Sequence, residues 1–139
     1  MLTFEATIDI DATPEQVWDV LVNTDAWPTW DPSCERIEGD VVPGGTVKAF
    51  TKLAPGRAFP VKVAELDAPR RMTWQGGMPL GLFRGVRTFD VERRGEGVRF
   101  TLREQFSGPM LALIKGSLPD MNEPFRGFCE GLKRVAEAG

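Results

Sequence analysis

The chain of 139 residues contains no histidine, no tyrosine and only two cysteines. The lack of histidine excludes a Ser-His-Asp triad, a Cys-His dyad and an HExxH zinc helix. Cys34 and Cys129 lie far apart and form no CxxC motif, so a structural zinc site is excluded too. We therefore expect no metal site, and we interpret the two cysteines as reduced thiols of a cytoplasmic protein.

A long hydrophobic run is also missing. The longest uncharged stretch, residues 105–114, has about ten residues, whereas a membrane-spanning helix needs about twenty. Glu5 and Asp9 interrupt the apolar N-terminal residues, which lack the basic and apolar regions of a signal peptide. The sequence thus predicts a cytoplasmic protein with no membrane span.

An excess of positive charge is absent as well. The chain has 17 Lys and Arg against 20 Asp and Glu, a formal charge of −3. A nucleic-acid binder needs a basic face, so we expect no nucleic-acid partner. One segment, interrupted by Glu92 and Glu96, gathers the arginines Arg84, Arg93, Arg94, Arg99 and Arg103. We interpret them as a solvated outer strand face rather than a phosphate site.

What is present begins with a strand and two short helices. The length predicts one domain, residues 1–139, because cores usually split only beyond roughly 250 residues. Residues 2–10 alternate loosely between apolar and polar, which is typical of a strand. Residues 13–16, Thr-Pro-Glu-Gln, form a capping box that starts a helix running to about residue 22. A second helical turn precedes Trp30, and we expect Trp27 within it to be half exposed.

Between residues 33 and 107 the apolar positions recur with a period of two. Glycine and proline separate the segments, and short connections between consecutive strands predict an antiparallel meander. The predicted strands are residues 34–39, 46–53, 58–66, 70–76, 83–93 and 98–106.

The C-terminal segment is amphipathic. Met121, Phe125, Phe128, Leu132 and Val135 are spaced at the period of one helix face. A sheet with one apolar face and a helix with one apolar stripe must bury these surfaces against each other. The order of elements therefore predicts an α+β fold, in which a curved sheet holds the helix and leaves room for a cavity.

Five stretches carry a family resemblance: IDIDATPEQVWDVL (8–21), WPTWDP (27–32), APRRMTW (68–74), FTLREQFSG (100–108) and FRGFCEGLK (125–133). In this order they resemble the START-like or Bet v 1-like superfamily, and most of all its bacterial polyketide cyclase/dehydrase and lipid-transport (SRPBCC) group. The resemblance implies a helix-grip fold, with a curved seven-stranded antiparallel sheet wrapped around a long C-terminal helix and two short helices after the first strand. It also implies an internal cavity for a hydrophobic small molecule, and no cofactor.

Glu104 is the most specific candidate for a functional residue in the predicted cavity. It alternates in phase with Phe100 and Leu102, on the apolar face, where a carboxylate is costly without a partner. If residues 94–97 form a four-residue turn, Arg87 lies opposite Glu104 and can pair with it in the cavity. Such a pair would either satisfy only itself or orient a polar group of the ligand. An isolated Glu104 would instead suit a general acid or base.

Apolar side chains of the sheet and the helix are candidates for the cavity wall, although each also suits plain core packing. With Arg87 and Glu104, the candidate ligand-binding residues are Trp74, Met72, Phe59, Phe89, Phe106, Met121 and Phe125.

Two further apolar segments, residues 76–83 and 109–114, fall where loops are expected. They leave open a lip over the cavity entrance, a homodimer contact, or loops folded over the core.

Two functions remain open, besides a third possibility, an interaction protein whose cavity has collapsed. The first is binding of a hydrophobic small molecule, lipid- or polyketide-like, between the sheet and the C-terminal helix. The second is a polyketide cyclase/dehydratase-type enzyme that uses Glu104 as acid or base. We favour binding, because the absence of histidine and tyrosine leaves few acid/base groups.

Overall fold

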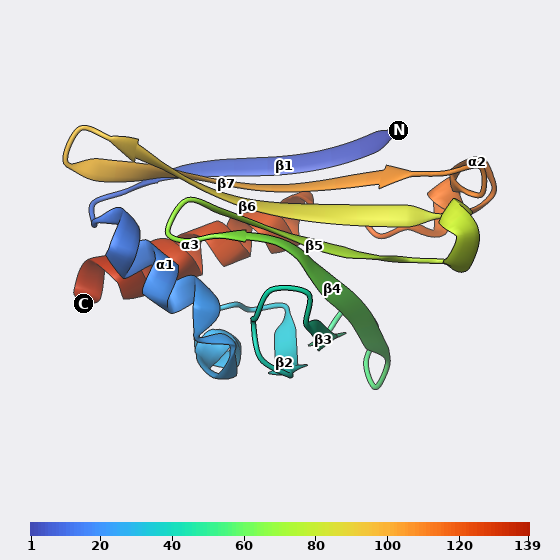
Figure 1. Cartoon of the computed structure of the whole chain (residues 1–139), viewed down its shortest axis with the longest axis horizontal. Coiled ribbons are helices and arrows are strands. Elements are labelled where there is room, and N and C mark those ends of the chain that lie inside the picture. Colours follow the sequence, from blue (N-terminus) through green and yellow to red (C-terminus); the bar gives the residue numbers. More distant parts are fainter.

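In the computed structural model, which describes residues 1–139, an antiparallel sheet curves around a long helix (Figure 1). The sheet has seven strands in the order β1-β7-β6-β5-β4-β3-β2. The strands are β1 (Leu2–Ile10), β2 (Cys34–Glu38), β3 (Thr46–Thr51), β4 (Ala58–Asp67), β5 (Arg71–Gly77), β6 (Arg84–Arg94) and β7 (Gly97–Ser107). The helical elements are α1 (Pro14–Val22), η1 (Thr24–Thr29), η2 (Pro79–Gly81), α2 (Leu111–Ile114), η3 (Lys115–Ser117) and α3 (Asn122–Ala138). The predicted helix-grip α+β fold is confirmed.

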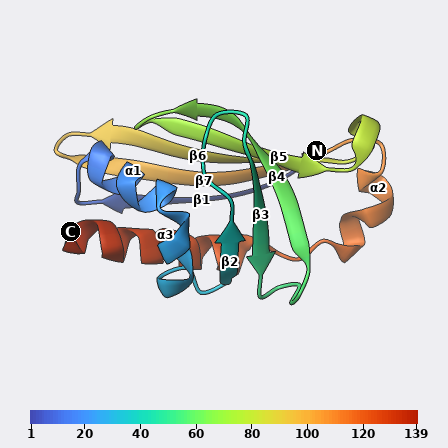
Figure 2. The same cartoon turned by 60° about the horizontal axis from the view of Figure 1, so that its bottom comes forward.

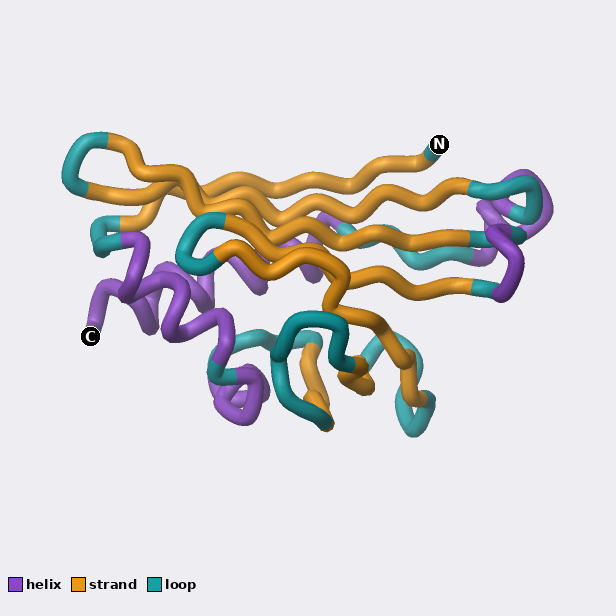
Figure 3. Tube along the Cα trace, in the orientation of Figure 1, coloured by secondary structure: helices purple, strands orange, loops and turns teal.

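The two longer helices and the short strands all lie on one side of the layer formed by the long strands. Figure 2 shows α3 running along the sheet, and Figure 3 places α1, η1 and the short strands β2 and β3 on that same side. The inner face of the sheet is therefore the face that α3 covers. None of the helices combines the length and the apolar composition that crossing a membrane requires.

The predicted start of α1 is confirmed in detail. The Gln16 backbone N–H donates to Thr13 Oγ1 at 3.1 Å, and the Thr13 backbone N–H donates to Gln16 Oε1 at 2.9 Å. Pro14 occupies the first turn, where its missing N–H costs no hydrogen bond. The helix then buries Trp18 and Leu21 against the core.

An aromatic cluster fills the space between η1, the sheet and α3. Trp27 stacks on Trp74 with ring centroids 5.3 Å apart. Trp27 and Trp30 both pack edge-to-face with Phe128, with ring centroids 5.1 and 4.9 Å apart. The expectation that Trp27 is half exposed is wrong, since only 2% of it is exposed. Its Nε1 donates to the Leu21 carbonyl at 3.1 Å, so the ring is buried with its polar atom satisfied.

Candidate functional site

One transverse row of side chains crosses the inner face of the sheet. Glu104 on β7 faces Phe4 on one side and Arg87 on the other, and Arg87 in turn faces Trp74 on β5. Trp74 is also opposite Val63 of β4, so the row joins five strands. Two charged residues therefore stand in the middle of an otherwise apolar row.

Arg87 and Glu104 form the predicted ion pair. Arg87 Nη2 donates to Glu104 Oε1 at 2.9 Å, and their side chains are 26% and 13% exposed. The predicted register is confirmed, because Arg94 pairs with Gly97 at the closing turn. The Arg87 guanidinium also lies 5.2 Å from the centroid of the Phe125 ring, a cation–π contact with α3. Glu104 Oε2 accepts no hydrogen bond within the protein, so this oxygen is free for another donor.

The next row on the same face, toward the connection between β5 and β6, contains two glycines side by side. Gly76 on β5 is directly opposite Gly85 on β6, and Gly85 is opposite Phe106 on β7. A Cβ atom on Gly85 would lie 3.2 Å from the Phe106 ring and 4.0 Å from Glu104 Oε2. The Phe106 ring therefore covers Gly85 immediately beside the ion pair, and a Cβ atom on Gly76 would likewise meet the Val61 side chain at 3.1 Å.

A second carboxyl group lies close to this row. Asp31, just after η1, is only 6% exposed, and its Oδ1 accepts hydrogen bonds from the backbone N–H and the hydroxyl of Ser33 at 3.2 Å each. Burial raises the pKa of Asp31, while these hydrogen bonds and the charges of Arg87 and Lys52 oppose the rise. Arg87 thus lies in the field of two carboxyl groups.

Two buried indole nitrogens have no acceptor. Trp30 Nε1 and Trp74 Nε1 are hidden from solvent, and neither donates to any atom of the protein. Such buried donors are uncommon, because an unmade hydrogen bond costs the desolvation of the group. Trp74 belongs to the same row as Arg87 and Glu104, so its free donor is part of the candidate site.

The predicted wall residues divide into three groups. Met72, Trp74, Phe89 and Phe125 are buried in the core, with at most 3% of each exposed. Phe106 and Met121 are half-buried. Phe59 is 38% exposed at the start of β4, where the Arg57 guanidinium lies 5.3 Å from its ring centroid. The Phe59 ring is thus not among the buried core side chains.

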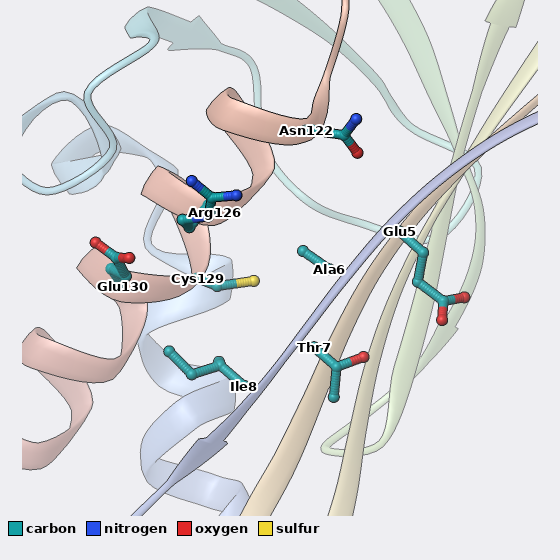
Figure 4. A pocket seen from close by; sticks show the side chains of 8 residues that line it. All are labelled: Glu5, Ala6, Thr7, Ile8, Asn122, Arg126, Cys129 and Glu130. Carbon is teal, nitrogen blue, oxygen red and sulfur yellow. The ribbon is translucent and has the colours of Figure 1, made fainter.

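A groove of about 450 Å³ lies elsewhere, between the edge strand β1 and α3. Ala6 and Ile8 line it from the strand, and Asn122, Arg126 and Cys129 from the helix (Figure 4). None of the predicted site residues contributes to this groove. It is lined largely by polar residues, which suits an apolar ligand less well than the inner face of the sheet.

The two cysteines are poor nucleophiles. Burial raises the pKa of Cys34 to about 11 and that of Cys129 to about 12, so both are thiols at neutral pH. No group of three or more His, Cys, Asp or Glu side chains is arranged to hold a metal ion.

Sequence reasoning missed three features of this region. It did not single out the facing Gly76 and Gly85, although the register of β5 against β6 would have paired them. It assigned no role to Asp31, because nothing in the sequence reveals the burial that its position after η1 produces. It also did not anticipate that the Trp74 indole would lack an acceptor.

The polyketide cyclase/dehydrase and lipid transport family model matches residues 1–137, and the chain belongs to this family. A search of curated protein sequences gives no match to this chain.

Several solved structures share the fold. The Aha1 dimer from Colwellia psychrerythraea is 23% identical, with a TM-score of 0.74 and coverage of 100% of this chain and 98% of that one. A START superfamily protein from Mycobacterium smegmatis is 13% identical, with a TM-score of 0.69 and coverage of 99% of both chains. A point mutant of a norcoclaurine synthase from Thalictrum, in complex with a transition-state analogue, is 15% identical, with a TM-score of 0.71 and coverage of 97% and 93%. These likenesses establish the START-like fold and leave the ligand open.

Proposed function

We propose that this protein binds a hydrophobic small molecule, lipid- or polyketide-like, against the inner face of the sheet beside the first half of α3. The observation that carries the proposal is the Arg87–Glu104 pair, in which the Glu104 side chain is 13% exposed on a face otherwise made largely of apolar side chains. A desolvated ion pair adds little net stability compared with apolar packing. Its position is better explained if it orients a polar group of the ligand.

Two free hydrogen-bonding atoms support a ligand with a hydroxyl or carbonyl group. Glu104 Oε2 can accept a hydrogen bond from a hydroxyl, and Trp74 Nε1 can donate one to an oxygen. The Phe106 ring, which covers Gly85, offers an apolar wall next to Glu104. The ligand would therefore place its polar end at the row of Glu104 and Trp74 and its apolar body against the Phe106 ring.

The enzyme alternative has less support. The Glu104 carboxylate is already held by Arg87, an arrangement that suits orienting a ligand more than exchanging protons with one. The chain has no histidine or tyrosine to serve as a second acid/base group. We place the binding function in the cytoplasm, where the two free thiols stay reduced.

Ligand titration with variants tests the proposal. The neutral fluorescent dye Nile red is bound to the parent protein and to Glu104→Gln, Arg87→Gln and Asp9→Asn, and is then displaced by a medium-chain fatty alcohol, whose hydroxyl can donate to Glu104 Oε2. Loss of a charge-assisted hydrogen bond weakens binding about tenfold, so we expect that change in the first two variants. Asp9→Asn breaks an exposed ion pair on the outer face of the same sheet and should bind like the parent.

Native mass spectrometry of the purified protein provides a second measurement. We expect a co-purified apolar molecule of lipid-like mass that Glu104→Gln retains less well. A parent protein that carries no such molecule and does not bind Nile red would overturn the proposal.

A further inference from the structure

One end of the sheet carries an unusual share of the exposed apolar side chains. Of the eight large hydrophobic residues that the protein exposes, four lie in or beside η2 and α2. Leu80 and Leu113 are 97% and 77% exposed, and Met78 and Leu82 are each 42% exposed. We call these four residues the apolar tip. Exposed apolar groups gathered in this way mark an interaction surface more often than chance.

A hydrogen bond joins the two chain segments that carry the apolar tip, one around η2 and the other around α2. The Met110 backbone N–H donates to the Leu82 carbonyl at 2.9 Å, which joins the segment after β7 to the one before β6. Gly108 has a φ of +108°, and a Cβ there would lie 2.6 Å from the same carbonyl oxygen, so only glycine permits this approach. Figures 1 and 2 both show η2 and α2 side by side at this end.

Leu80 has a strained backbone. Its φ of +60° lies in the left-handed region, which glycine or asparagine adopts far more easily than leucine. Leu80 makes no compensating apolar contact, since almost all of its side chain is exposed. Strain of this kind is concentrated at functional positions. The strain and the exposure together indicate that the leucyl side chain meets a partner.

Positive charge surrounds the apolar tip. Residues 76–84 and 107–118 contain no acidic side chain but include Arg84 and Lys115, in a chain whose net charge is −3. Both cations are exposed, and neither belongs to an ion pair. Apolar side chains rimmed by free cations are complementary to a lipid surface with anionic headgroups.

We propose that the apolar tip docks on an anionic lipid surface, with Leu80 and Leu113 inserted among the acyl chains and Arg84 and Lys115 at the headgroups. A second copy of this chain fits less well. A two-fold contact would bring the Arg84 and Lys115 side chains of both copies together with no acidic residue of the tip to offset them.

The apolar tip also lies next to the candidate ligand site. Phe83, which follows Leu82, stacks on Phe106 with ring centroids 5.6 Å apart, and Phe106 faces Gly85 in the row beside Glu104. An apolar molecule could pass from the lipid to the inner face along these rings. That route rests on the proposed ligand-binding function, whereas docking on lipid does not.

Vesicle flotation tests the docking. The full chain is mixed with vesicles of phosphatidylcholine, either pure or with about one-third phosphatidylserine. The variants are Leu80→Asn with Leu113→Ser, Arg84→Gln with Lys115→Gln, and the control Leu53→Ser, which alters an exposed leucine on the β3–β4 turn. Asparagine is chosen at position 80 because it tolerates the left-handed backbone.

We expect the parent and Leu53→Ser to float with the anionic vesicles. Removing both leucines should weaken binding more than about a hundredfold. Removing both cations should weaken binding about 25-fold, and this loss should appear on anionic vesicles only. A parent that does not bind anionic vesicles overturns the proposal. So does a parent that dimerises, in sedimentation measurements, through the same leucines without binding vesicles. Binding of Nile red in solution is measured in parallel, so that a failure of docking is distinguished from a failure of the ligand site.

Discussion

Arg87 and Glu104 lie directly opposite each other on β6 and β7, with Arg87 Nη2 2.9 Å from Glu104 Oε1. Two other cross-strand pairs of the sheet, Arg99 with Asp9 and Arg103 with Glu5, are on the solvated outer face. These outer pairs confirm the interpretation of the arginine-rich hairpin as a solvated strand face. The inner pair differs because it is largely shielded from water, so its partners depend on each other more strongly.

The inner ion pair should show this dependence in unfolding experiments. Replacing Arg87 by alanine leaves the shielded Glu104 carboxylate without its cation and should lower the free energy of unfolding by about 2 kcal/mol. The double variant Arg87→Leu with Glu104→Leu removes both charges and should regain most of this loss. Urea denaturation gives the values, with Arg99→Ala as the control on the outer face. Equal losses for Arg87→Ala and Arg99→Ala would show that the inner pair has no special environment.

Asp31 and Asp9 should have opposite effects on stability at neutral pH. Burial raises the pKa of Asp31 above its usual value of 3.8, so the native state binds this proton more readily than the unfolded state. The ionised carboxylate is therefore unfavourable at neutral pH, and protonation relieves the cost as pH falls through the raised pKa. Asp31→Asn keeps an acceptor for Ser33 and should stabilise the protein at neutral pH, with the gain vanishing in acid.

Asp9 provides the opposite case. The hydrogen bond from Arg99 lowers the pKa of Asp9 below 3.8, so its contribution is present above that value and is lost as pH falls through the lowered pKa. Asp9→Asn should destabilise the protein at neutral pH and make no difference in strong acid. Thermal unfolding from neutral pH down to the acidic range measures both variants. A gain from Asp31→Asn that persists in acid would contradict the assigned cause.

Gly131 should be sensitive to the addition of a single methyl group. A Cβ at this position of α3 would overlap the Trp30 carbonyl group, whose carbon would lie 2.9 Å away. Alanine favours a helix by about 1 kcal/mol over glycine, yet overpacking against a backbone group should reverse this and destabilise the protein by about 2 kcal/mol.

Gly127 in the same helix is the control for Gly131. A Cβ at Gly127 would meet the Pro32 ring at 3.3 Å, a contact that a small shift relieves. Gly127→Ala should therefore be nearly neutral in chemical denaturation. Equal gains in stability for both alanine variants would contradict the close approach of the Trp30 carbonyl to α3.

Local patterns predicted much of this fold because they act over short distances. The capping box at residues 13–16 fixed the start of α1, and the turn at residues 94–97 fixed the β6–β7 register and with it the Arg87–Glu104 pair. The stripe from Met121 to Val135 located α3. In each case the determining residues are neighbours in the sequence or across one short turn.

The remaining features depend on contacts between distant segments. Trp27 is buried because η1 turns its indole toward the Leu21 carbonyl and the Trp74 ring, which the sequence does not place together. The facing of Gly76 and Gly85 requires the β5–β6 register, which the six residues between those strands leave open to sequence reasoning. Chain neighbours alone could not predict either result.

Chemical-shift mapping of the isotope-labelled protein with a medium-chain fatty alcohol tests the central claim most directly. We predict that the alcohol perturbs the amides of Gly76, Gly85, Arg87 and Glu104, and that Gly85→Val abolishes these changes by crowding the Phe106 ring next to Glu104. Perturbations confined to the β1–α3 groove around Thr7 and Arg126, or unchanged by Gly85→Val, would contradict binding at the inner face of the sheet.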